Sequence, residues 1–172
     1  YGDVQATIDV AKPRTGRSVA ADARVGVGPW GDLSELPRSW DGALISLRMT
    51  TPLTSVVIHE ELGAIVALAT LADSAGEHVD VQRLAGLADA HSWAMDTLEA
   101  VATRDTVRGA AALLGIHHST LQARLAALEV GLGYETSTPG ARVRLGVALA
   151  LHRFSRGHFR QEGDGRAIAH GH

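Results

Sequence analysis

The chain has 172 residues, of which 45% are hydrophobic and 20% charged, and it contains no cysteine. The length suffices for one core or two small ones. The lack of cysteine excludes a disulfide scaffold, a thiolate zinc site and a cysteine nucleophile. No stretch approaches the roughly 20 apolar residues of a membrane span. The chain opens at Tyr1 without a basic-then-apolar leader, so we expect a cytoplasmic protein, or a piece cut from one, with no membrane partner.

The formal net charge of −3 conceals an asymmetry along the chain. Residues 1–104 hold 8 Lys and Arg against 14 Asp and Glu, whereas residues 105–160 hold 7 Arg against 3 acidic residues. A basic second part that follows an acidic first part is the pattern expected when only the second part meets a polyanion.

The first sixty residues predict a mixed α/β region. Apolar and polar residues alternate over residues 4–10, which predicts a half-buried strand, and residues 12–18 read as a loop. Short β-branched runs predict two more strands, over residues 24–28 and 55–58. Between these two strands we predict a helix with Ser39 as its N-cap.

Strand signals disappear after residue 61. An apolar stripe over residues 62–71 predicts a helix that ends near Gly76, and a second helix or helix pair is predicted over residues 79–103. Large apolar residues of this second segment, Trp93 and Met95 among them, are interpreted as core. The Gly- and His-rich tail, residues 161–172, is predicted to be disordered.

Residues 106–128 carry the most informative pattern. A first helix is predicted to end at Gly115, where freedom at positive φ allows a sharp turn. Ala111 precedes that turn by four residues and allows a second helix to cross closely, and Leu121 begins an inward stripe that continues at Leu125 and Leu128. Small Ala, turn Gly and a hydrophobe six residues later form the packing pattern of a helix-turn-helix.

The side chains that this packing leaves outside are the candidate DNA contacts. His118, Ser119 and Gln122 lie at the start of the second helix, the end that enters the major groove in this class, and we expect them to touch base edges. Three residues are expected to hold phosphates or brace the helix; these are Arg108, Thr120 and Arg124. His117 completes the candidate set. The alternative interpretation is that the two helices form an ordinary αα-corner and not a DNA-binding motif.

Other chemistries find no support in the sequence. His59 begins a zincin-like pair, but Gly63 stands where the second His would be, so no metal site is expected. His117 and His118 are neighbours that we expect to face different directions on a helix. No phosphate loop and no Gly-x-Ser-x-Gly elbow is present. We therefore expect no enzyme activity and no cofactor.

The second helix also resembles a known family. Ile116, His117, Thr120-Leu121 and Arg124-Leu125 resemble the recognition helix of PucR/CdaR-type transcriptional regulators. The resemblance covers roughly residues 91–154. Within it, Asp96-Thr97-Leu98 resembles the family's entry helix and Ala148-Leu149 its closing helix, and the helix pair is also similar to the Fis type. Ser119 and Gln122-Ala123 depart from the family, which often has Asn and aromatic residues there, so base preference does not transfer.

The first part of the chain resembles, more loosely, the degenerate GGDEF-like middle domain of the same family. The residues that carry this likeness are Val25-Gly26-Val27-Gly28, Leu33, Leu36, Ser39-Trp40, Ala43-Leu44 and His59-Glu60-Glu61-Leu62-Gly63. No GGDEF string and no suitably spaced carboxylate pair is present. The resemblance implies a signal-relay or dimerisation module, and an effector sensed by an upstream domain that this chain does not contain.

Together these observations predict an α+β, mostly helical chain with a small α/β N-terminal region and an all-α Fis-like helix-turn-helix domain. We place a partial GGDEF-like region at residues 1–75, the helix-turn-helix domain at 76–160 and the tail at 161–172. The expected function is sequence-specific transcription regulation by a homodimer that reads double-stranded DNA with the helix over residues 117–128. The alternatives are a Fis-like architectural DNA-binding protein and a non-catalytic helical interaction module.

Overall fold

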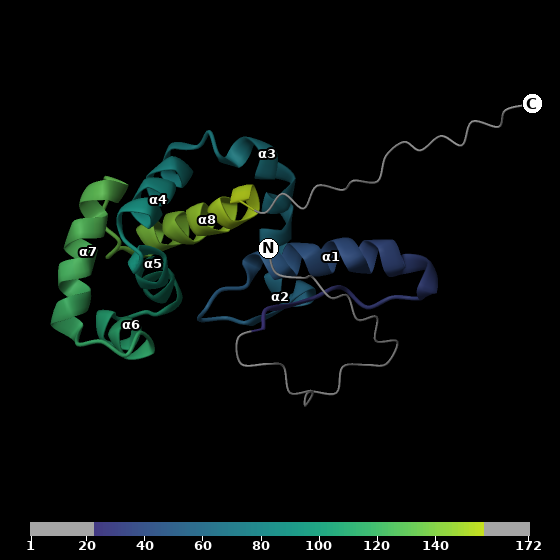
Figure 1. The fold of residues 1–172 in the computed structure, drawn as a ribbon, viewed down its shortest axis with the longest axis horizontal. Coiled ribbons are helices and arrows are strands. Elements are labelled where there is room, and N and C mark those ends of the chain that lie inside the picture. The colour runs from purple at the N-terminus through teal and green to yellow at the C-terminus, as the bar shows by residue number, and fades with distance from the viewer. Residues whose placement is uncertain (1–22, 157–172) are drawn as a thin grey trace, which may run out of the picture.

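The computed structural model describes residues 23–156, and helices dominate it, which confirms the expected mostly helical α+β class (Figure 1). The strand predicted over residues 4–10, the loop over 12–18 and the tail over 161–172 lie outside the described residues. In chain order the elements are β1 (Val25–Val27), the 3₁₀ turn η1 (Leu33–Glu35), α1 (Leu36–Met49), β2 (Val56–Ile58), α2 (His59–Leu62), the 3₁₀ helix η2 (Gly63–Leu71), α3 (Ala72–Ala75), α4 (Val79–Ala90), α5 (Ala94–Thr103), α6 (Val107–Leu113), α7 (His118–Leu132) and α8 (Pro139–Arg156).

The N-terminal part is a β-α-β unit. Strands β1 and β2 pair in parallel, with Val25 opposite Val56 and Val27 opposite Ile58, so both strands predicted within residues 24–58 are confirmed. Helix α1 connects them and lies directly against β1. A Cβ atom at Gly26 would overlap the carbonyl oxygen of Ala43 and the backbone nitrogen of Leu47. Glycine at this position therefore permits the close approach of strand and helix.

Helix α1 begins earlier than predicted. Its first residue is Leu36 and its N-cap position is Glu35, so the prediction that Ser39 caps the helix is wrong. The η1 turn leads directly into α1, and Pro37 occupies its first turn, where the fixed φ of proline is already helical. The helical periodicity therefore starts one turn ahead of the residue that looks like a cap.

The prediction of an α-helix over residues 62–71 is also wrong. Its residues form the 3₁₀ helix η2, flanked by the single turns α2 and α3, and none of its side chains is fully buried. Gly63 has a φ of +51°, which interrupts the α-helical path directly after Leu62. With three residues per turn, the spacing of an α-helical stripe no longer collects on one face. Ile65 and Leu71 are accordingly exposed.

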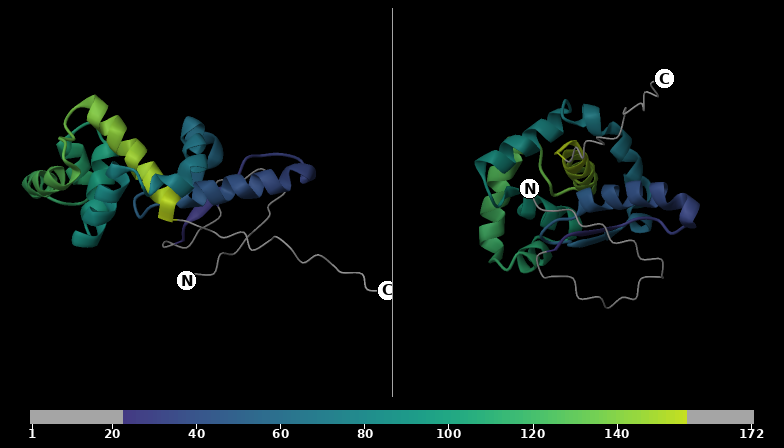
Figure 2. Two further views of the ribbon diagram at one scale, coloured as in Figure 1. Left: turned by 90° about the horizontal axis from the view of Figure 1, so that it is seen from above. Right: turned by 45° about the vertical axis from the view of Figure 1, so that its right-hand side comes forward.

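Helix α8 runs through the middle of the molecule and is shared by both parts (Figures 1 and 2). Its residues Leu145 and Leu149 pack with α4, α5 and α7 in the largest cluster of buried side chains, which also contains Leu84, Leu87, Ala94, Leu98, Leu128, Leu132 and Ala148. Towards its end, Ala150 and Phe154 pack with Met49 and Val57 of the β-α-β unit. The helix pair predicted over residues 79–103 is confirmed as α4 and α5.

A buried polar contact joins the β-α-β unit to the helices α5 and α8. The carboxylate of Glu99 on α5 accepts a hydrogen bond from the Thr51 hydroxyl at 2.6 Å and pairs with Arg153 on α8 at 3.0 Å. Thr51 lies between α1 and β2, so Glu99 connects three separate segments. Both its oxygens have partners, which is the condition under which a charge tolerates burial.

A buried histidine makes stability depend on pH. His152 on α8 is 4% exposed, and its Nδ1 has no hydrogen-bond partner among the described residues. Burial, reinforced by Arg156 and Arg153 and opposed by Asp89, lowers the pKa of His152 below the ordinary histidine value of 6.5. The unfolded chain therefore takes up the proton first as pH falls. The contribution of neutral His152 to the free energy of unfolding is fully present above about pH 6.5 and is lost progressively as the pH falls below that value.

We expect the free energy of unfolding, measured by urea titration at a series of pH values, to fall more steeply below about pH 6.5 in the wild type than in His152→Gln. Glutamine stays neutral throughout, so the difference between the two curves isolates the titration of His152. Parallel curves across that range would contradict this assignment.

Candidate nucleic-acid interface

Helices α6 and α7 form the predicted helix-turn-helix, at the end of the molecule away from α1 (Figure 1). Gly115 has a φ of +65°, as the predicted turn requires. Its N–H donates to the carbonyl of Ala112 at 3.2 Å, and the N–H of Ile116 donates to the carbonyl of Ala111 at 3.0 Å. This pair of bonds is a Schellman motif, which ends α6 and satisfies carbonyls left open by the helix.

The inward residues of the motif are buried as predicted. Ala111 and Leu121 meet in a cluster with Leu125 of α7 and with Ala100 and Val101 of α5, while Ile116 packs partly buried against it. Leu128 is fully buried in the main cluster. Helix α7 continues to Leu132, one turn beyond the predicted end at residue 128. The small side chain of Ala111 thus lies where the two helices cross.

The predicted site residues fall into two groups. Six of the seven are exposed, namely Arg108 on α6, His117 before α7, and His118, Ser119, Thr120 and Gln122 in its first two turns. Arg124 differs, because it is half-buried and its guanidinium carbon lies 4.9 Å from the centroid of the Trp93 ring. The structure therefore leaves six of these side chains exposed, on α6 and around the start of α7, and ties the seventh to the α4–α5 connection.

The two adjacent histidines do not diverge, which corrects the expectation from sequence. His117 is the N-cap of α7 and lies outside the helix, and its ring centroid is 4.3 Å from that of His118. The Nδ1 of His117 accepts from the Ser119 backbone N–H at 3.4 Å and lies 2.8 Å from the Ser119 hydroxyl. A capping residue leaves the helical path, so the rotation expected between neighbours on a helix does not apply. The contact also fixes the Ser119 side chain.

The electrostatics of this surface favour an anion. Residues 106–128 contain no Asp or Glu. Neither Arg108 nor Arg124 forms an ion pair with any residue in 23–156. The sequence nevertheless overstates the basic surface, because Arg144 and Arg153 are neutralised by Asp80 and Glu99 from the acidic first part. The free positive charge near α7 is therefore small and local.

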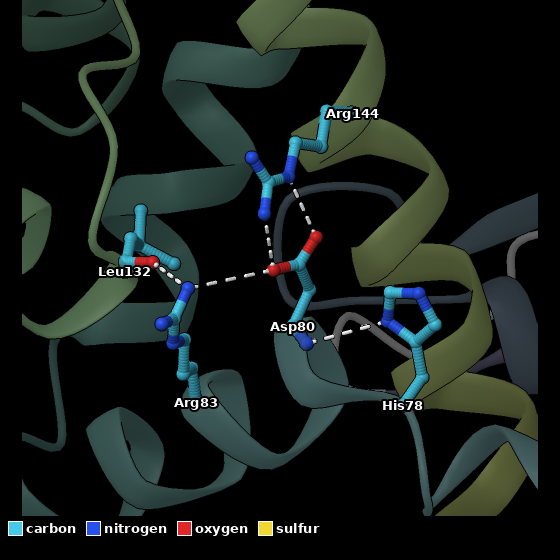
Figure 3. Close-up of polar contacts among 5 residues, drawn as sticks. All are labelled: His78, Asp80, Arg83, Leu132 and Arg144. Atoms are coloured by element: carbon cyan, nitrogen blue, oxygen red, sulfur yellow. Dashed lines mark hydrogen bonds and ion pairs between the residues drawn. The ribbon is translucent and has the colours of Figure 1, made fainter.

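The far end of α7 is anchored by a polar network around Asp80 (Figure 3). Asp80, buried on α4, receives two hydrogen bonds from Arg144 of α8, at 2.7 and 2.8 Å. These bonds lower the pKa of the Asp80 carboxyl. Arg83 lies 3.9 Å from the same carboxylate and donates to the carbonyl of Leu132 at 2.8 Å, at the last residue of α7. The network holds α4, α7 and α8 in a fixed relation and so orients the exposed end of α7.

Sequence reasoning missed two contributors to this geometry. Trp93 was interpreted as core, and it does pack partly buried against the main cluster, but it also stacks on His91 and faces Arg124. Asp80 carried no signal, because its partner Arg144 lies 64 positions along the chain. Only the three-dimensional arrangement reveals either contact.

Within residues 23–156, no three His, Cys, Asp or Glu side chains gather in a way that could hold a metal ion. No helix in that range is both long enough and apolar enough to cross a membrane.

A protein-family model matches part of the chain. Residues 94–151 match the model of the PucR C-terminal helix-turn-helix domain, which confirms most of the span over which the resemblance was seen. The comparisons with curated proteins and with solved structures returned no match. The matched segment runs from α5 to α8 and contains α6 and α7 whole. The match supports a PucR-type regulator and thus a DNA-binding transcription regulator.

Proposed function

We propose that this protein is a sequence-specific transcription regulator that inserts the N-terminal half of α7 into the major groove of double-stranded DNA. The observation that carries the proposal is the exposed, acid-free face at the start of α7, next to a turn with Schellman geometry. The helix N-terminus adds a partial positive charge that favours nearby phosphate. Such regulators are typically not enzymes, and we propose no catalytic role for the chain.

The site residues are proposed to act in two ways. His118, Ser119 and Gln122 contact base edges, and Gln122 is suited to a bidentate pair with adenine. His117 holds the Ser119 hydroxyl in place from the N-cap position. Three other residues bind phosphates or brace the helix; these are Arg108, Thr120 and Arg124.

We further propose that the protein acts as a homodimer. One helix of this type reads only a few base pairs, and two half-sites about 34 Å apart would supply the missing specificity. The β-α-β unit of β1, α1 and β2 is proposed to belong to a partial GGDEF-like region that relays a signal from an upstream effector-sensing domain. The division of the chain at residues 75 and 160 stays a prediction.

Salt dependence tests DNA binding itself. We expect the protein to bind a random-sequence duplex, followed by fluorescence anisotropy, with an affinity that falls steeply with salt. Arg108→Ala should reduce the slope of log K against log salt by about 0.9, the value for one lost phosphate contact. Arg38→Ala removes the same charge from an exposed site on α1 and should leave the slope unchanged. Failure of the wild type to bind at low salt would overturn the proposal.

Sequence reading requires a separate test. Selection from random DNA should return a consensus, and Gln122→Ala should reduce discrimination at one base position by about 1–3 kcal/mol. Gln82→Ala removes an exposed glutamine from α4 and serves as the matched control. Binding without a consensus would favour the Fis-like architectural reading. A dimer in sedimentation that ignores DNA would favour the interaction module.

A further inference from the structure

The contact between Arg124 and Trp93 holds a guanidinium whose N–H donors have no partner in the described part of the chain. Arg124 forms no ion pair or hydrogen bond in the described part of the chain, yet its guanidinium lies over the Trp93 ring at 4.9 Å. A guanidinium that lies over an aromatic ring can still donate its N–H groups to another partner. The side chain is therefore held in place while its donors stay unused.

The ring beneath Arg124 is itself firmly held. Trp93 lies between α4 and α5 and packs against the main core cluster. It also stacks on His91, with ring centroids 4.7 Å apart and planes 21° from parallel. Its carbonyl accepts hydrogen bonds from the hydroxyl of Thr97 at 2.7 Å and from the backbone N–H of Thr97 at 3.1 Å. The core packing and the stack on His91 hold the ring, and the two hydrogen bonds fix the backbone of Trp93 at the start of α5.

Arg124 borders the exposed face of α7 on the side opposite Gln122. Successive residues of a helix are rotated by about 100°. Gln122 follows the buried Leu121 by one position, and Arg124 precedes the buried Leu125 by one, so their side chains leave the buried stripe in opposite directions. A helix in the major groove has a phosphate backbone on each side. With α7 in the major groove as proposed, the edge marked by Arg124 faces one of these backbones.

We propose that Trp93 is a positioning residue that holds the guanidinium of Arg124 edge-on to a DNA backbone phosphate. The DNA interface then extends from the helix-turn-helix to the connection between α4 and α5. This inference rests on the proposed function, and it goes further by assigning a role to a residue outside the motif. The Trp93 ring favours Arg over Lys, because an ammonium group has no flat face to stack and no fixed N–H edge.

A double-mutant cycle on the full chain tests the proposal, with anisotropy on one duplex at one low salt concentration. We expect Arg124→Ala to weaken binding about tenfold, as the loss of a charge-assisted hydrogen bond predicts. Trp93→Leu should weaken it about two- to fivefold, the range of an exposed cation–π contact. In the Arg124→Ala background, Trp93→Leu should cause no further loss. Trp40→Leu, at an exposed tryptophan of α1, should leave affinity unchanged.

The preference for arginine separates positioning from mere support of the fold. Arg124→Lys should weaken binding in the wild type but have no effect in the Trp93→Leu background. Trp93→Phe, which keeps an aromatic ring, should retain part of the preference and covers the case in which the leucine variant does not fold. Additive losses, or an Arg-over-Lys preference that survives without the ring, would overturn the inference while DNA binding stands. A wild type that binds no DNA would overturn the proposed function itself.

Discussion

Replacing Leu121 with alanine is expected to lower the free energy of unfolding by about 2–5 kcal/mol and to weaken DNA binding even at a temperature where the variant is folded. Leu121 is fully buried and meets side chains of α5 and α6 in one cluster. Its removal leaves a cavity where three helices join, because those neighbours are held by other contacts and cannot close the gap. Urea denaturation followed by circular dichroism measures the loss.

The same helix offers a matched control. Val130 of α7 is 84% exposed, so Val130→Ala removes apolar atoms without opening a cavity and should change stability by less than about 0.5 kcal/mol. An equal loss in the two variants would contradict the buried position of Leu121. Native-like DNA affinity in Leu121→Ala at a temperature where both proteins are folded would show that the α6–α7 crossing does not set the interface.

The helix-turn-helix could be predicted because its signals are local. Ala111, Gly115 and Leu121 lie within eleven positions, and each meets a steric demand that its neighbours impose. The positive φ of Gly115 and the burial of both other residues follow from that spacing. The strands around residues 25 and 56 were similarly visible, since short β-branched runs bounded by turn residues are a local pattern.

Features that depend on distant partners or on competing local signals could not be predicted. The start of α1 was misplaced because Ser39 looks like a cap while the preceding turn and Pro37 already begin the helix. The apolar run after Leu62 suggested an α-helix, but Gly63 breaks the path and a 3₁₀ helix follows. Each local pattern was compatible with two structures, and the surrounding chain decided between them.

The candidate site shows the same division. Exposure of Gln122 and its neighbours at the start of α7 follows from the helical period once the buried stripe is known. The state of the charges does not follow, because Arg144 and Arg153 are neutralised by acids that precede them by 64 and 54 positions. The basic second half of the sequence thus contributes partly to internal ion pairs, and its contribution to a DNA-binding surface is smaller than its net charge indicates.

Glu99→Ala is expected to lower the free energy of unfolding by about 3–5 kcal/mol, the cost of leaving a buried charge without its partner. Burial lowers the pKa of Arg153 and the carboxylate of Glu99 opposes that shift, so the substitution removes the group that stabilises the guanidinium. The hydroxyl of Thr51 loses its acceptor in the same step. Thermal and urea unfolding both measure the loss. Glu35→Ala, at the exposed ion pair with Arg38, should cost less than about 1 kcal/mol.

Replacing both partners distinguishes the cost of an unpaired charge from the value of the pair. A double variant with Glu99→Met and Arg153→Met keeps the volume of the contact and leaves no charge behind, so most of the lost stability should return. Because Glu99 links the segment after α1 to α5 and α8, the single variant should also increase hydrogen exchange around Thr51 before the helix-turn-helix is affected. A double variant as unstable as Glu99→Ala would show instead that the ion pair contributes net stability, and that α8 depends on it to hold the β-α-β unit against α5.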